Sequence, residues 1–189
     1  MPTLLMLHGL TGNGNMIRDF AKKICPDNVT LITPDAPFKN EVRGFGWWDF
    51  PRKNEIELHK QIQFSIKYLL KIIPKDDPLI IGGFSQGAAL ALELLFSEIN
   101  SRVVGLLILS SRSVDVSNLS AKLNLVESGR IFWMHGKTDH RIPFEEGEKV
   151  LKIFENTNWE IKRIIHEKGH MIPTEFNNDI KEWLTLFSN

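Results

Sequence analysis

A glycine-flanked serine between two apolar segments constrains the fold of this chain more than any other feature. The sequence reads Gly82-Gly83-Phe84-Ser85-Gln86-Gly87, after the apolar segment 79–83 and at the start of segment 85–96, which is apolar nearly all round. Gly-x-Ser-x-Gly between a strand and a helix is typical of a nucleophile elbow, a strained turn that presents the serine hydroxyl. Strand and helix approach closely there, so only small residues fit at Gly83 and Gly87. The alternative is a glycine-rich turn without catalytic function.

Strand-like and helix-like segments alternate along the whole chain. Strands are expected at 3–8, 29–33, 79–83, 103–109, 131–135 and 159–165, and helical periodicity marks 17–24, 62–73, 85–96, 147–154 and 176–187. Segment 110–128 is polar and ambiguous. This alternation predicts a mostly parallel sheet of about six strands with helices on both faces, a compact three-layer α/β sandwich without a large lid. A chain of 189 residues suits a single domain over residues 1–189.

The residues that could activate Ser85 also follow expected strands. In such sheets, ligands bind beyond the carboxyl ends of the strands. Asp139 follows segment 131–135, and His170 follows segment 159–165. The order serine, acid, histidine fits the elbow. We therefore predict that Asp139 orients His170, that His170 takes the serine proton, and that Ser85 forms an acyl-enzyme. Asp115, after segment 103–109, is the alternative acid.

The chain has six histidines, so the choice of a base needs a reason. His170 is favoured by its order in the chain and by Gly169, which frees the loop to bend. Of the other histidines, His8 and His135 are expected to shape loops and His59 to lie at the surface. His140 is on the wrong strand end for a base after the acid, and His166 is too near its own strand to reach over.

A tetrahedral intermediate needs backbone N–H donors aimed at its oxyanion. One donor is expected at Gln86, directly after the nucleophile, and the second at Leu10, in a glycine-rich loop after the first strand. Phosphate binding is the alternative function of a loop rich in glycine. The loop lacks both the G-x-G-x-x-G order and a Walker lysine, which argues against that function.

An aromatic loop follows the second expected strand. It carries Phe38, Phe45, Trp47, Trp48 and Phe50. Its place in the chain puts it near the mouth of the site, where Trp47, Trp48 and Phe38 are candidates to contact an acyl group. The alternative is that these rings simply cap the core.

Composition excludes several other classes of function. Lys plus Arg equals Asp plus Glu at 23 each, so the net charge gives no reason to expect nucleic acid as a partner. No apolar run approaches the roughly 20 residues of a membrane span, and no signal peptide is recognisable. We expect a soluble, cytoplasmic protein, monomeric or homodimeric, without stable membrane insertion, metal or cofactor.

Cys25, the only cysteine, is expected to be a small buried residue on a helix.

Five segments together resemble the phospholipase/carboxylesterase family of α/β-hydrolases, which includes acyl-protein thioesterases and small carboxylesterases. The matching segments run in family order: Leu7-His8-Gly9-Leu10-Thr11-Gly12, Pro34-Asp35-Ala36-Pro37, Gly82 to Ala88, His135-Gly136-Lys137-Thr138-Asp139 with Ile142-Pro143, and Gly169-His170.

The resemblance implies the α/β-hydrolase fold and hydrolysis of esters or thioesters through Ser85, Asp139 and His170. It also implies Leu10 and Gln86 as oxyanion donors, no metal, and a small-molecule or acyl ester as substrate. The chain is short for the family, and segment 110–128 and the loop after Pro37 are where differences are expected. A catalytically silent binding module and a peptidase with the same triad remain alternatives.

Overall fold

A six-stranded parallel sheet forms the centre of the protein in this computed structural model, which describes residues 1–51 and 54–188. The strand order is β2-β1-β5-β6-β7-β8, and each neighbouring pair is parallel. The strands are β1 (Thr3–Leu7), β2 (Thr30–Ile32), β5 (Leu79–Phe84), β6 (Val103–Leu109), β7 (Arg130–Gly136) and β8 (Glu160–His166). They coincide with the six expected segments to within one or two residues at each end, which confirms the predicted sheet.

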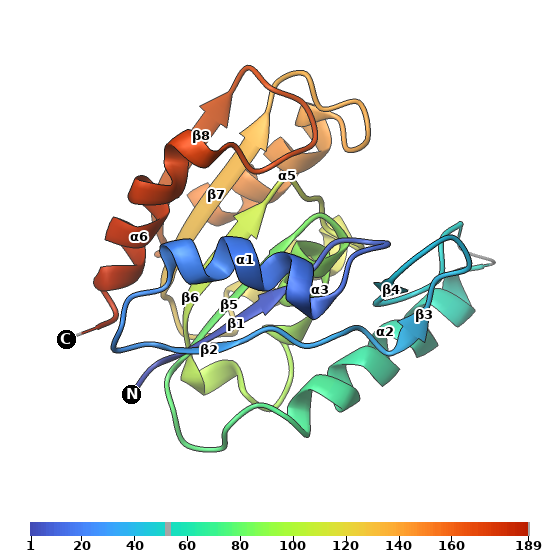
Figure 1. The fold of residues 1–189 in the computed structure, drawn as a ribbon, viewed down its shortest axis with the longest axis horizontal. Coiled ribbons are helices and arrows are strands. Elements are labelled where there is room, and N and C mark those ends of the chain that lie inside the picture. The colour runs from blue at the N-terminus through green and yellow to red at the C-terminus, as the bar shows by residue number, and fades with distance from the viewer. Residues whose placement is uncertain (52–53, 189) are drawn as a thin grey trace.

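Helices cover both faces of this sheet, with α1 and α6 in front of it and α3 and α5 behind it in Figure 1. The helices are α1 (Gly14–Ile24), α2 (Glu55–Leu70), α3 (Gln86–Leu94), α4 (Val116–Leu123), α5 (Phe144–Glu155) and α6 (Asn177–Thr185), with short 3₁₀ turns at Asn100–Arg102 and Thr174–Phe176. Alternate strand residues enter opposite cores: Leu4 and Met6 pack with α1 and α6, whereas Leu5 and Leu7 pack with the other helices. The predicted three-layer sandwich is confirmed.

The aromatic loop contains structure that the sequence did not reveal. Its strands β3 (Phe38–Lys39) and β4 (Phe45–Gly46) form a two-stranded antiparallel sheet. Phe45 also pairs with the loop after β1: the Thr11 N–H donates to its carbonyl at 2.9 Å, and its own N–H donates to the Gly12 carbonyl at 2.8 Å. The loops after β1 and β2 are therefore held together at the carboxyl edge of the sheet.

Two smaller expectations change in the structure. Cys25 is not within a helix but is the C-cap of α1, and it is half-buried against the apolar cluster between α1 and α6, with its Sγ 3.5 Å from the Val29 carbonyl oxygen. The ambiguous segment 110–128 contains α4. Asp115 caps that helix by accepting the Asn118 N–H at 2.9 Å, which gives this alternative acid a structural role.

Glu93 is the one residue of α3 that is not fully buried, and it is still largely enclosed. Burial raises the pKa of Glu93 to about 7, and the charge of Asp115 adds to the increase while Lys122 opposes it. A carboxyl group with a raised pKa favours the folded state when it is protonated. Stability should therefore fall as the pH rises from the ordinary pKa of 4.5 to about 7.

We expect Glu93→Gln to remove this penalty. The free energy of unfolding at pH 8 should rise by about 1–3 kcal/mol over the unmodified protein, because glutamine stays neutral. At pH 5 the two proteins should differ little, since Glu93 is then mostly protonated in the folded state. Urea denaturation at both pH values measures the difference. Glu98→Gln, at an exposed position, is the matched control. If Glu93→Gln changed the free energy of unfolding equally at both pH values, the prediction would be contradicted.

Candidate active site

Ser85 lies at the junction of β5 and α3 in a backbone conformation that side chains rarely adopt. Its φ is 55° and its ψ is −118°. Such a conformation costs on the order of 1–3 kcal/mol and persists only where the surroundings impose it. Here the Ser85 N–H donates to the Leu109 carbonyl at 2.9 Å, and its own carbonyl accepts the Ser111 hydroxyl at 2.7 Å. The strained turn expected from the sequence is therefore present.

The two glycines around Ser85 are sterically required. A Cβ on Gly83 would overlap the backbone of Gly87 and Ala88, and a Cβ on Gly87 would lie 2.5 Å from the carbonyl oxygens of Leu7 and His8. The first contact joins β5 to α3, and the second joins α3 to the end of β1. This confirms the prediction that only small residues fit at both positions.

Asp139 is a buried carboxylate at the end of β7 that holds the imidazole of His170. Its Oδ2 accepts from His170 Nδ1 at 2.7 Å, and its Oδ1 accepts the N–H groups of Arg141 and Ile142 at 2.9 Å each. Burial acts to raise the pKa of Asp139, but these hydrogen bonds outweigh burial and hold the pKa below its ordinary value. The carboxylate thus stays ionised at neutral pH and engages Nδ1 of His170, so Nε2 is the ring nitrogen left out of this contact.

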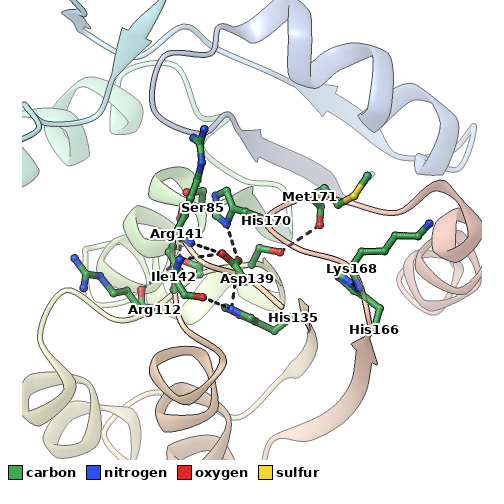
Figure 2. A network of polar contacts seen from close by, with 12 residues as sticks. Ser85, Arg112, His135, Asp139, Arg141, Ile142, His166, Lys168, His170 and Met171 are labelled. Carbon is green, nitrogen blue, oxygen red and sulfur yellow. Dashed lines mark hydrogen bonds and ion pairs between the residues drawn. The ribbon is translucent and has the colours of Figure 1, made fainter. Parts of the chain in front are cut away.

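His135 is a second histidine beside this carboxylate, and Figure 2 shows Asp139 between the two rings. His135 Nε2 lies 2.9 Å from the Ile142 carbonyl oxygen and 3.5 Å from Asp139 Oδ2. Burial lowers the pKa of His135, so the ring is neutral and donates to Ile142. It supports the loop that carries Asp139, which agrees with the loop-shaping role expected from the sequence.

The loop after β8 brings His170 back across the sheet toward Ser85. The His170 ring lies against Phe84, with ring centroids 4.8 Å apart, and the Met171 carbonyl accepts the Ser110 hydroxyl at 3.3 Å. Ser85 and His170 line the same cavity, whose volume is about 450 Å³. Within the described residues no hydrogen bond joins the two side chains. Catalytic hydrogen bonds of this kind often tighten only when substrate is bound.

The loop after β1 lies beside the elbow because β1 and β5 are neighbours. Buried His8 shapes this loop: its Nε2 accepts the Ala36 N–H at 3.0 Å, and its Nδ1 donates to the Gly9 carbonyl at 2.8 Å. Leu10 and Gln86 both line the cavity. No hydrogen bond among the described residues uses either of their backbone N–H groups, as expected for two oxyanion donors.

The predicted aromatic contacts need correction. Trp48 lines the cavity, but Trp47 is fully buried and donates through Nε1 to the His8 carbonyl at 2.8 Å. Phe38 lies outside the lining and packs against Phe64, with ring centroids 5.5 Å apart. Trp47 is thus a core residue that ties the aromatic loop to β1, and Phe38 joins that loop to α2.

The side chain of Gln86 holds the backbone of Trp47 and Trp48 in place. Its Oε1 accepts the Trp47 N–H, and its Nε2 donates to the Trp48 carbonyl, both at 2.9 Å. The residue after Ser85 therefore fixes the loop whose residues Trp48 and Phe50 line the cavity. No local pattern in the sequence indicates this contact, because its partners lie almost forty positions away.

Several lining residues were not among the predicted site residues. They are Gly9, Thr11, Phe50, Phe84, Ala89, Ser111, Arg112, Arg141 and Ile142. Ser111 and Arg112 come shortly after β6, and Arg141 and Ile142 follow Asp139. The rule that sites form beyond the strand ends could have found these four.

Two further structural properties bear on the class of site. In residues 1–51 and 54–188, no group of three or more His, Cys, Asp or Glu side chains is placed to hold a metal ion. None of the helices in the same residues has the length and apolar character needed to cross a membrane.

The parallel sheet, the strained serine turn and the acid and histidine at later strand ends define an α/β-hydrolase. Within that class, the chain belongs to the phospholipase/carboxylesterase family, whose model matches residues 1–188. The family assignment makes it a hydrolase of ester bonds.

Known proteins resemble this chain in sequence and in fold. Acyl-protein thioesterase 1 of Neurospora crassa is 27% identical, over 97% of this chain and 85% of the relative, and the same-named protein of Gibberella zeae is 24% identical, over 96% and 88%. Among solved structures, SOBER1 of Arabidopsis thaliana has a TM-score of 0.81 at 21% identity with both chains fully covered. Acyl-protein thioesterase 2 of Zea mays has a TM-score of 0.80 at 21% identity, over 100% of this chain and 94% of that one. The structural similarity establishes the fold.

Proposed function

We propose that this protein hydrolyses carboxylic esters or thioesters through an acyl-enzyme on Ser85, with His170 as base and Asp139 as its acid partner. One observation carries the proposal. A buried, ionised carboxylate holds Nδ1 of His170 at 2.7 Å, and that imidazole shares a cavity with a serine on a strained turn. The names of the thioesterase relatives are consistent with the thioester alternative.

The reaction follows from the roles of these groups. His170 accepts the Ser85 proton on Nε2 while Oγ attacks the substrate carbonyl, and Asp139 stabilises the imidazolium that forms. The backbone N–H groups of Leu10 and Gln86 stabilise the oxyanion, and the N-terminal end of α3 adds a favourable dipole. His170 then protonates the leaving group. Water, activated by the same base, releases the acid from Ser85.

The cavity around Ser85 suits an acyl group. Trp48, Phe50 and Ala89 give it apolar walls, and its volume of about 450 Å³ is in the range of small-molecule sites. Trp48 and Phe50 come from the aromatic loop, so this loop and α3 would together set the acyl-chain preference. The same triad could cleave amides or be catalytically silent, which makes covalent reaction at Ser85 the first property to test.

We expect a fluorophosphonate probe to label Ser85, because an activated serine attacks phosphorus and the adduct resembles the tetrahedral intermediate. Peptide mass spectrometry of the labelled protein identifies the residue. Ser111 provides a matched control: it lines the same cavity, but its hydroxyl donates to the Ser85 carbonyl. Ser111→Ala should keep the label and Ser85→Ala should lose it. Label at a different residue would refute Ser85 as nucleophile.

A further inference from the structure

A second cavity meets the first at His170. Its volume is about 530 Å³, and it shares six lining residues with the first cavity: Gly9, Leu10, Thr11, Phe84, Arg141 and His170. Ser85 and Gln86 line the first cavity only. His170, the candidate base, thus borders both cavities, whereas Ser85, the candidate nucleophile, lines only the first.

In the proposed reaction, the acyl group and the leaving group of the substrate occupy different cavities. The acyl group becomes bonded to Ser85, and its carbonyl oxygen lies against Gln86, so it occupies the first cavity. The leaving group takes a proton from His170, and this residue borders both cavities. The second cavity therefore lies where the leaving group departs.

Positive charge and apolar surface line the second cavity. Its apolar part is formed by Met16, Ile17, Phe20, Met171 and Ile172, and its cationic part by Lys23, Arg43 and Arg141. Two of the apolar side chains face water: Met16 is 56% exposed and Met171 is 45% exposed. Exposed apolar side chains gathered in one cavity indicate a contact surface for a ligand.

In the part of the chain that the structure describes, no ion pair involves the cationic side chains of this cavity, Lys23, Arg43 and Arg141. None of the described Asp and Glu residues belongs to the lining. The whole chain is nonetheless neutral, with 23 basic and 23 acidic residues. Positive charge is therefore concentrated beside the site, and the Arg141 side chain extends away from Asp139 (Figure 2).

We propose that the second cavity binds the leaving group and selects one that carries a phosphate or carboxylate on an aliphatic framework. Arginine and lysine bind both anions, and the methionine and phenylalanine side chains accept the aliphatic part. The inference rests on the proposed function, since it assigns the leaving-group side of the same reaction. In that reaction the C–S or C–O bond breaks, the proton goes from His170 to sulfur or oxygen, and the anionic group itself is unchanged.

Matched thioesters test the selectivity. Octanoyl-4′-phosphopantetheine and octanoyl-pantetheine differ only by the phosphate. S-octanoyl-N-acetyl-Cys-Glu-amide and its Cys-Gln counterpart differ only by a carboxylate. We expect kcat/KM for at least one anionic member to exceed its neutral mate by about tenfold at low salt, and the ratio to approach one in 0.5 M NaCl. The two pairs distinguish a phosphate from a carboxylate as the recognised group.

The double variant Lys23→Gln with Arg43→Gln identifies the source of the selectivity. A partly exposed charge contributes about two- to fivefold, so the anionic-to-neutral ratio should fall about tenfold in the double variant. Lys60→Gln is the control, because Lys60 is exposed on α2 and lines neither cavity. A ratio near one in the unmodified protein, or a ratio that the double variant leaves unchanged, overturns the inference.

A binding measurement separates failure of this inference from failure of the proposed function. Calorimetry with the Ser85→Ala protein compares 4′-phosphopantetheine with pantetheine, and N-acetyl-Cys-Glu-amide with its Cys-Gln counterpart, so it does not require turnover. We expect at least one anionic thiol to bind about fivefold more tightly than its neutral mate, and the difference to disappear with the two added glutamine substitutions. If no thioester or ester is hydrolysed, the proposed function fails, and this comparison still decides the inference. Equal affinities within both pairs overturn the inference even in an active enzyme.

Discussion

Replacing Ser85 with alanine should lower kcat/KM for p-nitrophenyl esters by at least about 10⁴-fold. Alanine keeps the backbone and the cavity walls but removes the only atom in the proposed mechanism that can form the acyl-enzyme. Any activity that remains should come from the oxyanion donors and from substrate binding. Initial rates with esters of two to twelve acyl carbons measure the effect and also give the acyl-chain preference of the unmodified enzyme.

The control for this substitution is Ser111→Ala. Both serines line the same cavity, but only Ser85 lies on the strained turn, at a φ of 55°. Ser111→Ala should lower kcat/KM by less than about tenfold, because it removes one neutral hydrogen bond to the Ser85 carbonyl. Thermal unfolding of both variants verifies that they are folded. Wild-type activity no greater than that of Ser85→Ala would reject the enzymatic function.

The same assay separates the remaining alternatives. Anilides with the same acyl groups test the peptidase alternative, and faster cleavage of anilides than of esters would favour it. A maximum at short acyl chains would count against a thioesterase for long acyl groups. The walls formed by Trp48 and Phe50 are expected to favour chains long enough to contact both rings.

The sequence predicts the sheet, and it predicts that the three candidate residues lie at strand ends on one edge of that sheet, because both depend on local order. The central strands β1, β5, β6 and β7 are short and almost wholly buried, and each candidate residue lies just beyond a strand end. Ser85, Asp139 and His170 follow β5, β7 and β8, whose parallel arrangement brings their carboxyl ends to one edge. The strain at Ser85 is likewise predictable, since Gly83 and Gly87 are required by contacts within the turn and with the adjacent strand.

The sequence does not predict which aromatic residues face the cavity. Trp47 and Trp48 are adjacent, yet one is buried in the core and the other lines the site. Hydrogen bonds from distant parts of the chain make the difference: Gln86 binds the backbone of both tryptophans, and the Ser65 hydroxyl donates to the Trp47 carbonyl at 2.6 Å. Contacts of this kind leave no periodicity that a sequence pattern can detect.

Replacing Asp139 with asparagine should lower kcat/KM by about 10³–10⁴-fold while the protein stays folded. Asp139 Oδ2 accepts a hydrogen bond from His170 Nδ1 at 2.7 Å. An asparagine amide in the same place can instead donate to Nδ1, which puts the imidazole proton on Nε2, where it cannot accept the Ser85 proton. The loss should appear mainly in kcat, because Asp139 is not among the residues that line the cavity. Steady-state kinetics with the preferred p-nitrophenyl ester measures this division.

Asp115→Asn is the matched control, because it makes the same chemical change at the alternative acid. Asparagine caps a helix about as well as aspartate, so α4 should be retained and kcat/KM should change by less than about twofold. If Asp115→Asn lost more activity than Asp139→Asn, Asp115, which follows β6, would be the acid partner instead of Asp139. The contacts argue for Asp139: its carboxylate accepts three hydrogen bonds, one of them from His170, whereas the Asp115 side chain accepts one from its own helix. The ordering of these two losses therefore decides which strand end supplies the acid.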